Sequence, residues 1–384
     1  MPSIAVFVRK TPRDLLRRYL AHANIVLPDS VTWDEPTSTP IIKAMDALDR
    51  DAHERVMRDF GRVAVLADES GQNALYGVAG RPHEIDALPS GHARALWAYI
   101  FAFEVFRRAE EVRYTDDRRR GKQWSGFLGD PDAELQRDEE TIERFKQAVR
   151  EQFGSPNVHV DVFDRHKRRL RGDLELVQAT VYLEDRPDQL LEFVNGQLDV
   201  RDHRPVVEAS LTYEPESGSI EVVARNQETR ETFVRLFAEN LLRTDFNGQP
   251  VPVRRYEIDK LRQPFAFPTD ASDGIERVRI NSMRLMPLDT ASQRVTLECL
   301  RGEEGTIWQV SAARFGAADP LRNGWLLTQV KFTITFHREP RSSVGKTLPL
   351  TITMPHGCDL KDRTEHERLV GEKYLREWGL LQDL

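Results

Sequence analysis

Apolar residues recur at helical spacing through about the first 155 residues of the chain. Thr11 and Thr39 each stand directly before a proline, a pair typical of the start of a helix. Ser90 can cap the long apolar segment that follows it, and Gly154 is a suitable stop for the last amphipathic stretch. We predict helices over about 12–21, 40–60, 90–114 and 138–153, whereas the glycine-spotted stretch 61–91 has no clear period.

The period of the apolar positions changes from 3.6 to 2 after Pro156, which predicts strands. Alternating segments lie at 158–162, 177–183, 207–213 and 220–224, and the turn 215–218 joins the last two as a hairpin with one buried face. An amphipathic helix is predicted over about 227–242, with Phe233, Phe237 and Leu241 on its apolar side. Such a helix would cover the apolar face of the sheet.

The last part of the chain repeats the order of hairpin and then helix. Segments 330–336 and 348–354 both alternate cleanly, so a hairpin is predicted over about 328–354. A short helix is expected at 307–315. Thr364 and Glu367 form a capping-box pattern for a final helix at about 365–378.

These patterns predict an α+β protein in which a helical N-terminal domain precedes two antiparallel-sheet units, each covered by helices. The expected domains are residues 1–155, mainly helical, then 156–265 and 266–384, both α+β. A chain of 384 residues is long enough for two or three such domains, each with its own core.

Composition adds three restrictions. The longest apolar stretch, 95–103, is too short to span a membrane, and we expect neither a leader peptide nor a membrane partner. Two cysteines, Cys299 and Cys358, exclude a disulfide framework and a thiolate-rich metal site, which fits a cytoplasmic protein. The excess of arginine over lysine is typical of a GC-rich genome, so a bacterial origin is expected.

Basic runs are the strongest indication of a binding function, because the whole chain has a net charge of -7. Residues 165–171 read Arg-His-Lys-Arg-Arg-Leu-Arg, which we expect to form a loop able to follow a phosphate backbone. Two further clusters combine cations with an aromatic residue, as sites for single-stranded nucleic acid often do. The candidate nucleic-acid-binding residues are Arg118, Arg119, Arg120, Lys122, Trp124, Arg165, Lys167, Arg168, Arg169, Arg171, Arg254 and Arg255.

The pattern therefore favours a non-catalytic binding protein, which contacts DNA or RNA through these basic segments or a protein partner as a subunit of a larger complex. Each cluster also has a purely structural alternative, in which neighbouring acids such as Asp161, Asp164 and Asp173 neutralise the arginines. No catalytic residue, metal site or cofactor is predicted, since phosphate-loop, dinucleotide-binding and nucleophile-elbow motifs are absent from the sequence.

A metal-dependent nuclease or phosphodiesterase is the alternative function. His159 and Asp161 would point to the same face of a strand and could both reach one ion. Asp164 and His166 lie nearby in sequence, but the next strand lacks the Glu-x-Lys pair of restriction-type nucleases.

Overall fold

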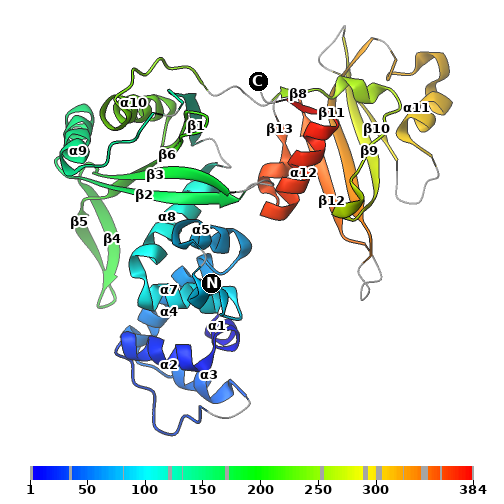
Figure 1. The fold of residues 1–384 in the computed structure, drawn as a ribbon. Helices are drawn as coiled ribbons and strands as arrows, with labels where there is room; N and C mark the ends of the chain where they lie inside the picture. The colour runs from blue at the N-terminus through cyan, green and yellow to red at the C-terminus, as the bar shows by residue number, and fades with distance from the viewer. Residues whose placement is uncertain are drawn as a thin grey trace. The chain divides into compact units, whose positions relative to one another are not determined.

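The structure is a computed structural model that describes most of the chain (Figure 1). The described residues are 3–33, 37–80, 82–119, 123–131, 133–168, 173–250, 255–288, 293–299, 305–322, 324–338, 345–354 and 357–382. They divide into two compact units, Met1–Val251 and Pro252–Leu384. Each unit has its own antiparallel five-stranded sheet.

The first unit begins with a helical region. Its helices are α1 (Ile4–Lys10), α2 (Arg13–His22), α3 (Thr39–Asp46), α4 (Arg50–Val65), α5 (Glu69–Ala79), α6 (His83–Asp86), α7 (Gly91–Phe101) and α8 (Phe103–Arg119). Phe7 stacks on Phe60 at its centre, Tyr19 lies tilted against Phe60, and the Tyr19 hydroxyl donates a hydrogen bond to the buried Asp59 at 3.0 Å. The region is helical as predicted, but the single helix predicted over 40–60 is wrong, because α3 ends at Asp46 and α4 begins at Arg50.

The predicted helix over 90–114 is wrong in one respect, because it is two helices. Ser90 caps α7 as expected, with its hydroxyl accepting from the Ala93 amide at 3.1 Å. Ala102 then leaves the helical conformation, with φ -141° and ψ 56°, and α8 starts at Phe103. Neither proline nor glycine marks this break, which instead allows α8 to pack against the central sheet.

The central sheet follows, with the strand order β1-β7-β6-β3-β2. Its strands are β1 (Trp124–Leu128), β2 (Val158–Arg168), β3 (Asp173–Glu184), β6 (Val206–Glu214) and β7 (Ser219–Val223). All neighbours are antiparallel, and the 215–218 turn closes the β6–β7 hairpin as predicted. β1 had no counterpart among the predicted strands.

The apolar face of this sheet carries the alternating residues that the sequence indicated. Val160, Val181, Leu211 and Val222 are buried together beneath α9 (Glu139–Phe153) and α10 (Gln227–Phe237). A π-helical turn, η1 (Ala238–Leu242), continues α10. Figure 1 shows α9 and α10 on one side of the sheet and α5 and α8 on the other.

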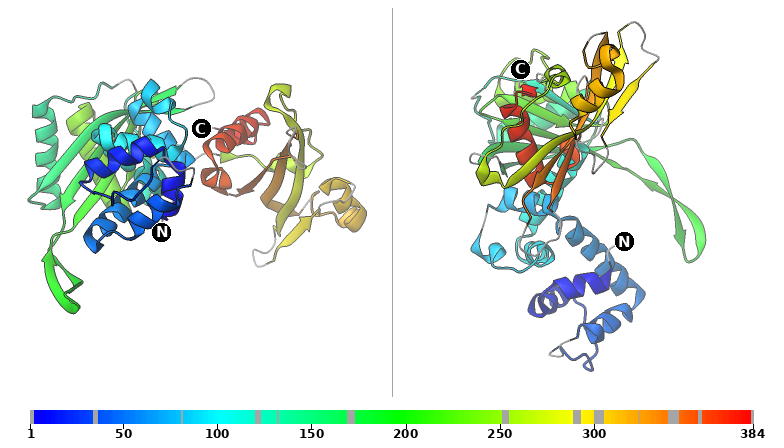
Figure 2. Two further views of the ribbon diagram at one scale, coloured as in Figure 1. Left: turned by 90° about the horizontal axis from the view of Figure 1, so that it is seen from below. Right: turned by 90° about the vertical axis from the view of Figure 1, so that its right-hand side faces the viewer.

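A two-stranded ribbon, β4 (Asp188–Val194) paired with β5 (Gln197–His203), extends from the first unit (Figure 2). Its tip is the two-residue turn Asn195-Gly196, with φ values of 52° and 78°. Both values are positive, as a type I′ hairpin turn requires. The ribbon was not among the predicted elements.

The second unit contains a sheet of order β10-β9-β11-β12-β13 and a small pair, β8 with β14. The strands are β8 (Arg255–Tyr256), β9 (Ile275–Pro287), β10 (Val295–Glu298), β11 (Trp325–Phe336), β12 (Thr347–Thr353), β13 (Gly357–Cys358) and β14 (Leu381–Gln382). The helices are α11 (Ile307–Phe315), α12 (Glu365–Glu377) and the 3-10 turns η2 (Asp259–Arg262), η3 (Ala271–Asp273), η4 (Gly316–Ala318) and η5 (Asp359–Asp362).

The predictions for this unit are confirmed closely. Phe332 pairs with Leu350 at the centre of the β11–β12 hairpin. Thr364 and Glu367 form the capping box at the start of α12, and Trp378 at its end packs against Phe332. The fold is therefore α+β, with a helical region followed by sheet-and-helix units. Across the part of the chain that the structure describes, no helix is long and apolar enough to cross a membrane.

Truncation of a buried ring should reveal how strongly α10 is held on the sheet. Phe237 is fully buried beside Phe145 and Tyr213. Phe237→Ala should lower the free energy of unfolding by about 3–5 kcal/mol, because it removes apolar contacts and leaves a cavity. Chemical denaturation followed by circular dichroism measures this loss. The control Glu231→Ala, on the exposed side of α10, should change stability by no more than about 0.5 kcal/mol. A similarly small loss in Phe237→Ala would contradict the packing.

Candidate functional site: the polar face of the central sheet

The second face of the central sheet is polar, yet it is largely buried. Asp161 on β2 pairs with Thr180 on β3, and Thr180 pairs with Ser210 on β6. On the same face, Gln178 pairs with Thr212 and Tyr182 with Glu208. Gln178, Thr180, Ser210 and Thr212 are all at least 97% buried. Sequence alternation had indicated only one buried face.

Helices α8 and α5 cover this polar face. Gly77 on α5 lies so close to β2 that a Cβ atom there would be 2.7 Å from the carbonyl oxygen of His166. Ala74 of α5, Val112 of α8 and Phe163 of β2 form a small apolar cluster at the junction. The Gln178 amide donates to the Thr115 hydroxyl of α8 at 3.4 Å. The helical region is thus joined to the sheet through polar and apolar contacts together.

Two carboxylates face each other across Tyr182 within this buried layer. The Tyr182 hydroxyl donates to Glu111 on α8 at 2.8 Å, and Arg107 also donates to that carboxylate. Burial nevertheless raises the pKa of Glu111. Burial, together with the nearby charge of Glu111, raises the pKa of Glu208 to about 7, although Arg118 acts in the opposite direction. Glu208 therefore changes its charge near neutral pH.

Several buried polar atoms of this layer have no hydrogen-bond partner among the described residues. They are Glu111 Oε2, Trp124 Nε1, Arg165 Nε, Gln178 Oε1, Glu208 Oε1 and Ser210 Oγ. Buried polar groups are normally paired with protein or with ordered water. The layer between α8 and the sheet is therefore more polar than an ordinary protein core.

The candidate nuclease residues lie on β2, where Asp161 is bound by arginines. Its carboxylate accepts from Arg107 at 2.7 Å and from Arg108 at 3.1 and 3.2 Å. Burial would raise the pKa of Asp161, but these two guanidinium groups hold it below its ordinary value. His159 lies on the same face, against the Tyr182 ring. The described residues contain no group of three His, Cys, Asp or Glu side chains that could hold a metal ion.

The basic run 165–171 begins inside a strand instead of a loop, because β2 continues to Arg168. The Arg165 side chain is only 4% exposed, and it donates to Asp116 at 3.3 Å and to Thr212 at 3.4 Å. Asp164 accepts from Arg137 at 2.8 Å, so it is not the partner of Arg165. Burial removes Arg165 from the surface. The Arg168 side chain and residues Arg169 and Arg171 lie outside the described residues.

The second cluster lies at the end of α8 and the start of β1. Arg119 forms an ion pair with Glu221, and its guanidinium is 5.9 Å from the ring centre of Trp124. Arg118 is exposed, stacks at 4.0 Å over Tyr114 and donates to Gln123 at 3.1 Å. Arg120 and Lys122, which complete the predicted cluster, lie outside the described residues.

These two clusters, separated in sequence, meet at Asp116. Burial would raise the pKa of this carboxyl group, but Arg165, Lys167 and Arg119 together hold it below its ordinary value. Cations from the end of α8 and from the end of β2 therefore lie near the same carboxylate. We call the described residues Arg118, Arg119 and Lys167 the basic edge.

The third cluster is in the second unit, where two neighbouring residues, Tyr256 and Lys260, have structural contacts. Tyr256 is buried and pairs with Leu381, and Arg255 precedes it on β8. Lys260 donates to the carbonyl oxygen of Trp378 at 3.0 Å, where α12 ends. Arg254 lies outside the described residues, as does the Arg255 side chain.

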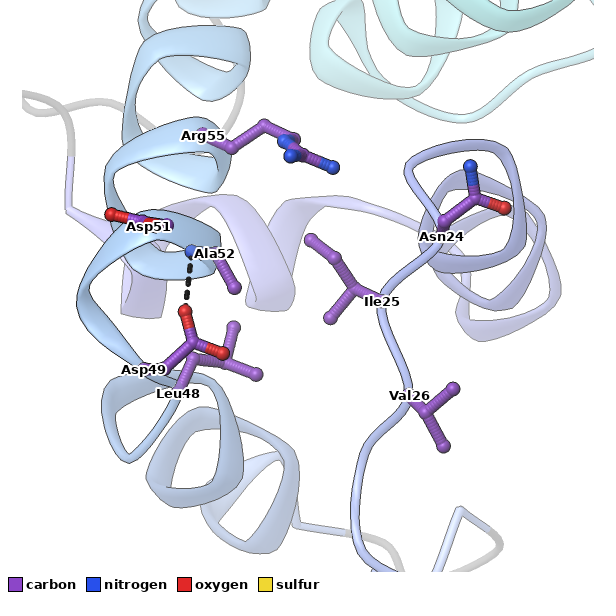
Figure 3. Close-up of a pocket in the computed structure, with 8 residues that line it drawn as sticks. All are labelled: Asn24, Ile25, Val26, Leu48, Asp49, Asp51, Ala52 and Arg55. Atoms are coloured by element: carbon purple, nitrogen blue, oxygen red, sulfur yellow. Dashed lines mark hydrogen bonds between the residues drawn. The ribbon is translucent and has the colours of Figure 1, made fainter.

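A surface hollow of about 230 Å³ lies in the helical region, between the end of α2 and the start of α4 (Figure 3). Ile25, Val26, Leu48 and Ala52 supply apolar atoms, and Asp49 is occupied in capping α4 through the Ala52 amide. A second hollow, at the edge of the central sheet, includes His159 and Tyr182. Neither brings together residues that form a recognisable catalytic group.

Sequence reasoning missed Glu111, Tyr182 and Glu208. Two signals were present: the small polar residues that alternate with apolar ones on β3 and β6, and paired glutamates at the middle of α8. Comparison with known proteins adds no assignment, because no family model matches the chain and no curated protein matches it significantly.

Glu208 should make the stability of the protein fall as pH rises. The pKa of Glu208 is about 7 in the folded protein against an ordinary value of 4.5. Between these two pH values the folded state therefore keeps a proton that the unfolded state has lost. Glu208→Gln lacks this titrating group. Its free energy of unfolding, relative to that of the wild type, should therefore rise by roughly 2 kcal/mol between pH 5 and pH 8. Urea denaturation at both pH values measures the difference. The exposed Glu239→Gln serves as the control and should follow the wild type. An equal effect of Glu208→Gln at both pH values would contradict the assignment.

Proposed function

We propose that the protein is a non-catalytic nucleic-acid-binding protein that contacts the phosphate backbone through its basic edge. The observation that supports this most is the meeting of two separate basic runs around Asp116. Cations from distant segments, gathered on a chain whose net charge is -7, are typical of an anion-binding surface.

The sequence supports the same site. Arg120 and Lys122 follow Arg119 closely in sequence, and Arg168, Arg169 and Arg171 follow Lys167. Each run that contributes to the basic edge is therefore part of a longer basic segment of the sequence.

Arg165 has a different role in this proposal. Arg165 is buried, and its ion pair with Asp116 connects β2 with α8 close to Arg118, Arg119 and Lys167. Loss of one partner from a buried ion pair usually destabilises a protein strongly, because the other charge stays buried. A variant of Arg165 would therefore mix a stability effect with any binding effect, and the binding test should avoid it.

The double variant Arg118→Ala, Lys167→Ala should weaken nucleic-acid binding. Each cation that contacts a phosphate releases counterions, so the loss of two should lower affinity roughly tenfold at low salt. It should also reduce the slope of log affinity against log salt by about 1 to 2. Unrelated sequences should lose affinity equally, since backbone contacts carry no sequence information. Fluorescence anisotropy with labelled single-stranded DNA, duplex DNA and RNA, at several salt concentrations, measures all three effects.

The matched control is Arg9→Ala, Lys10→Ala, which removes two exposed cations from α1. Equal losses in both double variants would show non-specific attraction only and would overturn the proposed site. Absence of binding by the wild-type protein would overturn the function itself. Cleavage of the probe with Mg²⁺ or Mn²⁺ that EDTA stops would favour the metal-dependent nuclease instead.

A further inference from the structure

The sheet of the second unit has two unlike faces. Val330, Phe332 and Ile334 of β11 are buried, and Trp378, at the end of α12, packs against Phe332 on that side (Figure 1). The alternate residue Lys331 is exposed, although β11 is the central strand of this sheet. Successive side chains of a strand point to opposite faces, so the face of Lys331 is accessible to solvent. We call it the open face.

Strand pairing arranges the residues of the open face in four rows across β9, β11 and β12. In order along β11, the rows are Arg284–Gln329–Thr353, Ser282–Lys331–Thr351, Arg279–Thr333–Pro349 and Arg277–Thr335–Thr347. Each row contains one Arg or Lys. Neighbouring rows lie about 6.8 Å apart, because same-face residues alternate along a strand that rises about 3.4 Å per residue. The cations therefore form a line about 20 Å long.

Positive charge is in excess on the open face. Arg277 and Lys331 are exposed and Arg284 is half-buried, and none of the three forms an ion pair with another described residue. Arg279 is held at one end of the sheet, where it donates to the carbonyl oxygen of Gly305 at 3.2 Å. The pairing of β10 with β9 adds one acid, Glu298, beside Ser282. One carboxylate therefore stands against four cations.

The charge of the whole unit has the same sign. Residues 252–384 contain 20 Lys or Arg and 18 Asp or Glu, so they carry a net charge of +2, although the whole chain carries -7. An antiparallel sheet often has one solvated face, so exposure alone indicates no ligand. Cations gathered on that face, in the less acidic unit of an acidic chain, indicate an anion.

The side chains between the cations narrow the kind of anion. All residues of the four rows except Pro349 are Arg, Lys, Thr, Ser or Gln, which are among the side chains that contact nucleic-acid phosphates. None is aromatic, so the rows offer no surface on which bases could stack. A line of cations also fits a chain of phosphates better than one compact anion, which would meet only one or two of them.

We propose that the open face is a further nucleic-acid-binding surface, on which Arg277, Arg284 and Lys331 contact the phosphates of one backbone. The hydroxyl groups of the neighbouring threonines donate to phosphate oxygens between these cations. Binding here is independent of base sequence, since backbone contacts carry no sequence information. This inference rests on the proposed function, but it uses residues of a different unit from those of the basic edge.

The double variant Arg284→Thr, Lys331→Thr tests the open face in the full-length chain. Threonine is chosen because it suits a strand and already occurs in the same rows. Affinity for labelled single-stranded DNA, duplex DNA and RNA should fall roughly tenfold at low salt, because two phosphate contacts are lost. The slope of log affinity against log salt should decrease by about 1 to 2. Fluorescence anisotropy measures both effects, and far-UV circular dichroism checks the fold.

The matched control is Arg314→Ala, Arg322→Ala, which removes two exposed cations of the same unit that lie outside the four rows. It should bind like the wild type. Equal losses in the control and in Arg284→Thr, Lys331→Thr would show general attraction to the unit and would overturn the open face as a site. Displacement of the probe by poly-glutamate as readily as by unlabelled nucleic acid would overturn the assignment of the ligand and indicate an acidic protein segment.

Comparison with Arg118→Ala, Lys167→Ala separates this inference from the proposed function. Unchanged binding in Arg284→Thr, Lys331→Thr, with a loss in the basic-edge variant, would overturn the open face and leave the basic edge in place. The reverse result would support the open face and overturn the basic edge. Losses in both, with a further loss when the four substitutions are combined, are the expected result, because two separate surfaces then contribute.

Discussion

Charge compensation beneath α8 is the constraint on which the first unit depends. Transfer of a charged group from water to a protein interior costs several kcal/mol unless partners are supplied. Asp161 meets Arg107 and Arg108, and Arg165 meets Asp116. Each of these pairs joins α8 to β2, so the same contacts that neutralise the buried charges also attach the helical region to the sheet.

This constraint gives the central sheet two unlike faces. Beneath α9 and α10 the contacts are apolar and tolerate small displacements. Beneath α8 they depend on hydrogen-bond geometry, because Gln178, Thr180 and Ser210 are buried there. Glu208, whose pKa is raised by burial to about 7, lies in this second layer, so a change of pH near neutrality acts on the polar contacts between α8 and the sheet.

Much of the fold could be predicted because burial of apolar area follows simple periods. Phe233 and Phe237 on α10, and the hairpin pair Phe332 and Leu350, lie where those periods placed them. The break at Ala102 was not predicted, because neither proline nor glycine marks it in the sequence. The ribbon escaped prediction because a hairpin far from any core has no buried face to impose a long alternating pattern.

The candidate site could be assembled from the sequence only in part, for a related physical reason. Clusters of like charge are local and visible in sequence, so Arg118, Arg119 and Lys167 could be named as candidates. Their partners are distant: Arg165 and Asp116 are separated by 49 residues, and Glu221 is 102 residues from Arg119. A single sequence does not indicate which carboxylate lies near which guanidinium group. That pairing decides whether a cation lies in the interior or at the surface.

The turn Asn195-Gly196 determines what the ribbon presents to its surroundings. With two residues at the tip, Phe193 faces Leu198, and Leu191, Phe193, Leu198 and Val200 share one side. Insertion of one residue at the tip would shift β5 by one position, and every β5 side chain would change sides. Leu198 and Val200 would then lie on the side of Glu192, and Asp199 on the side of Phe193. Asn195 and Gly196, through their positive φ values, thus determine which side chains share each face of the ribbon, although neither residue is part of those faces.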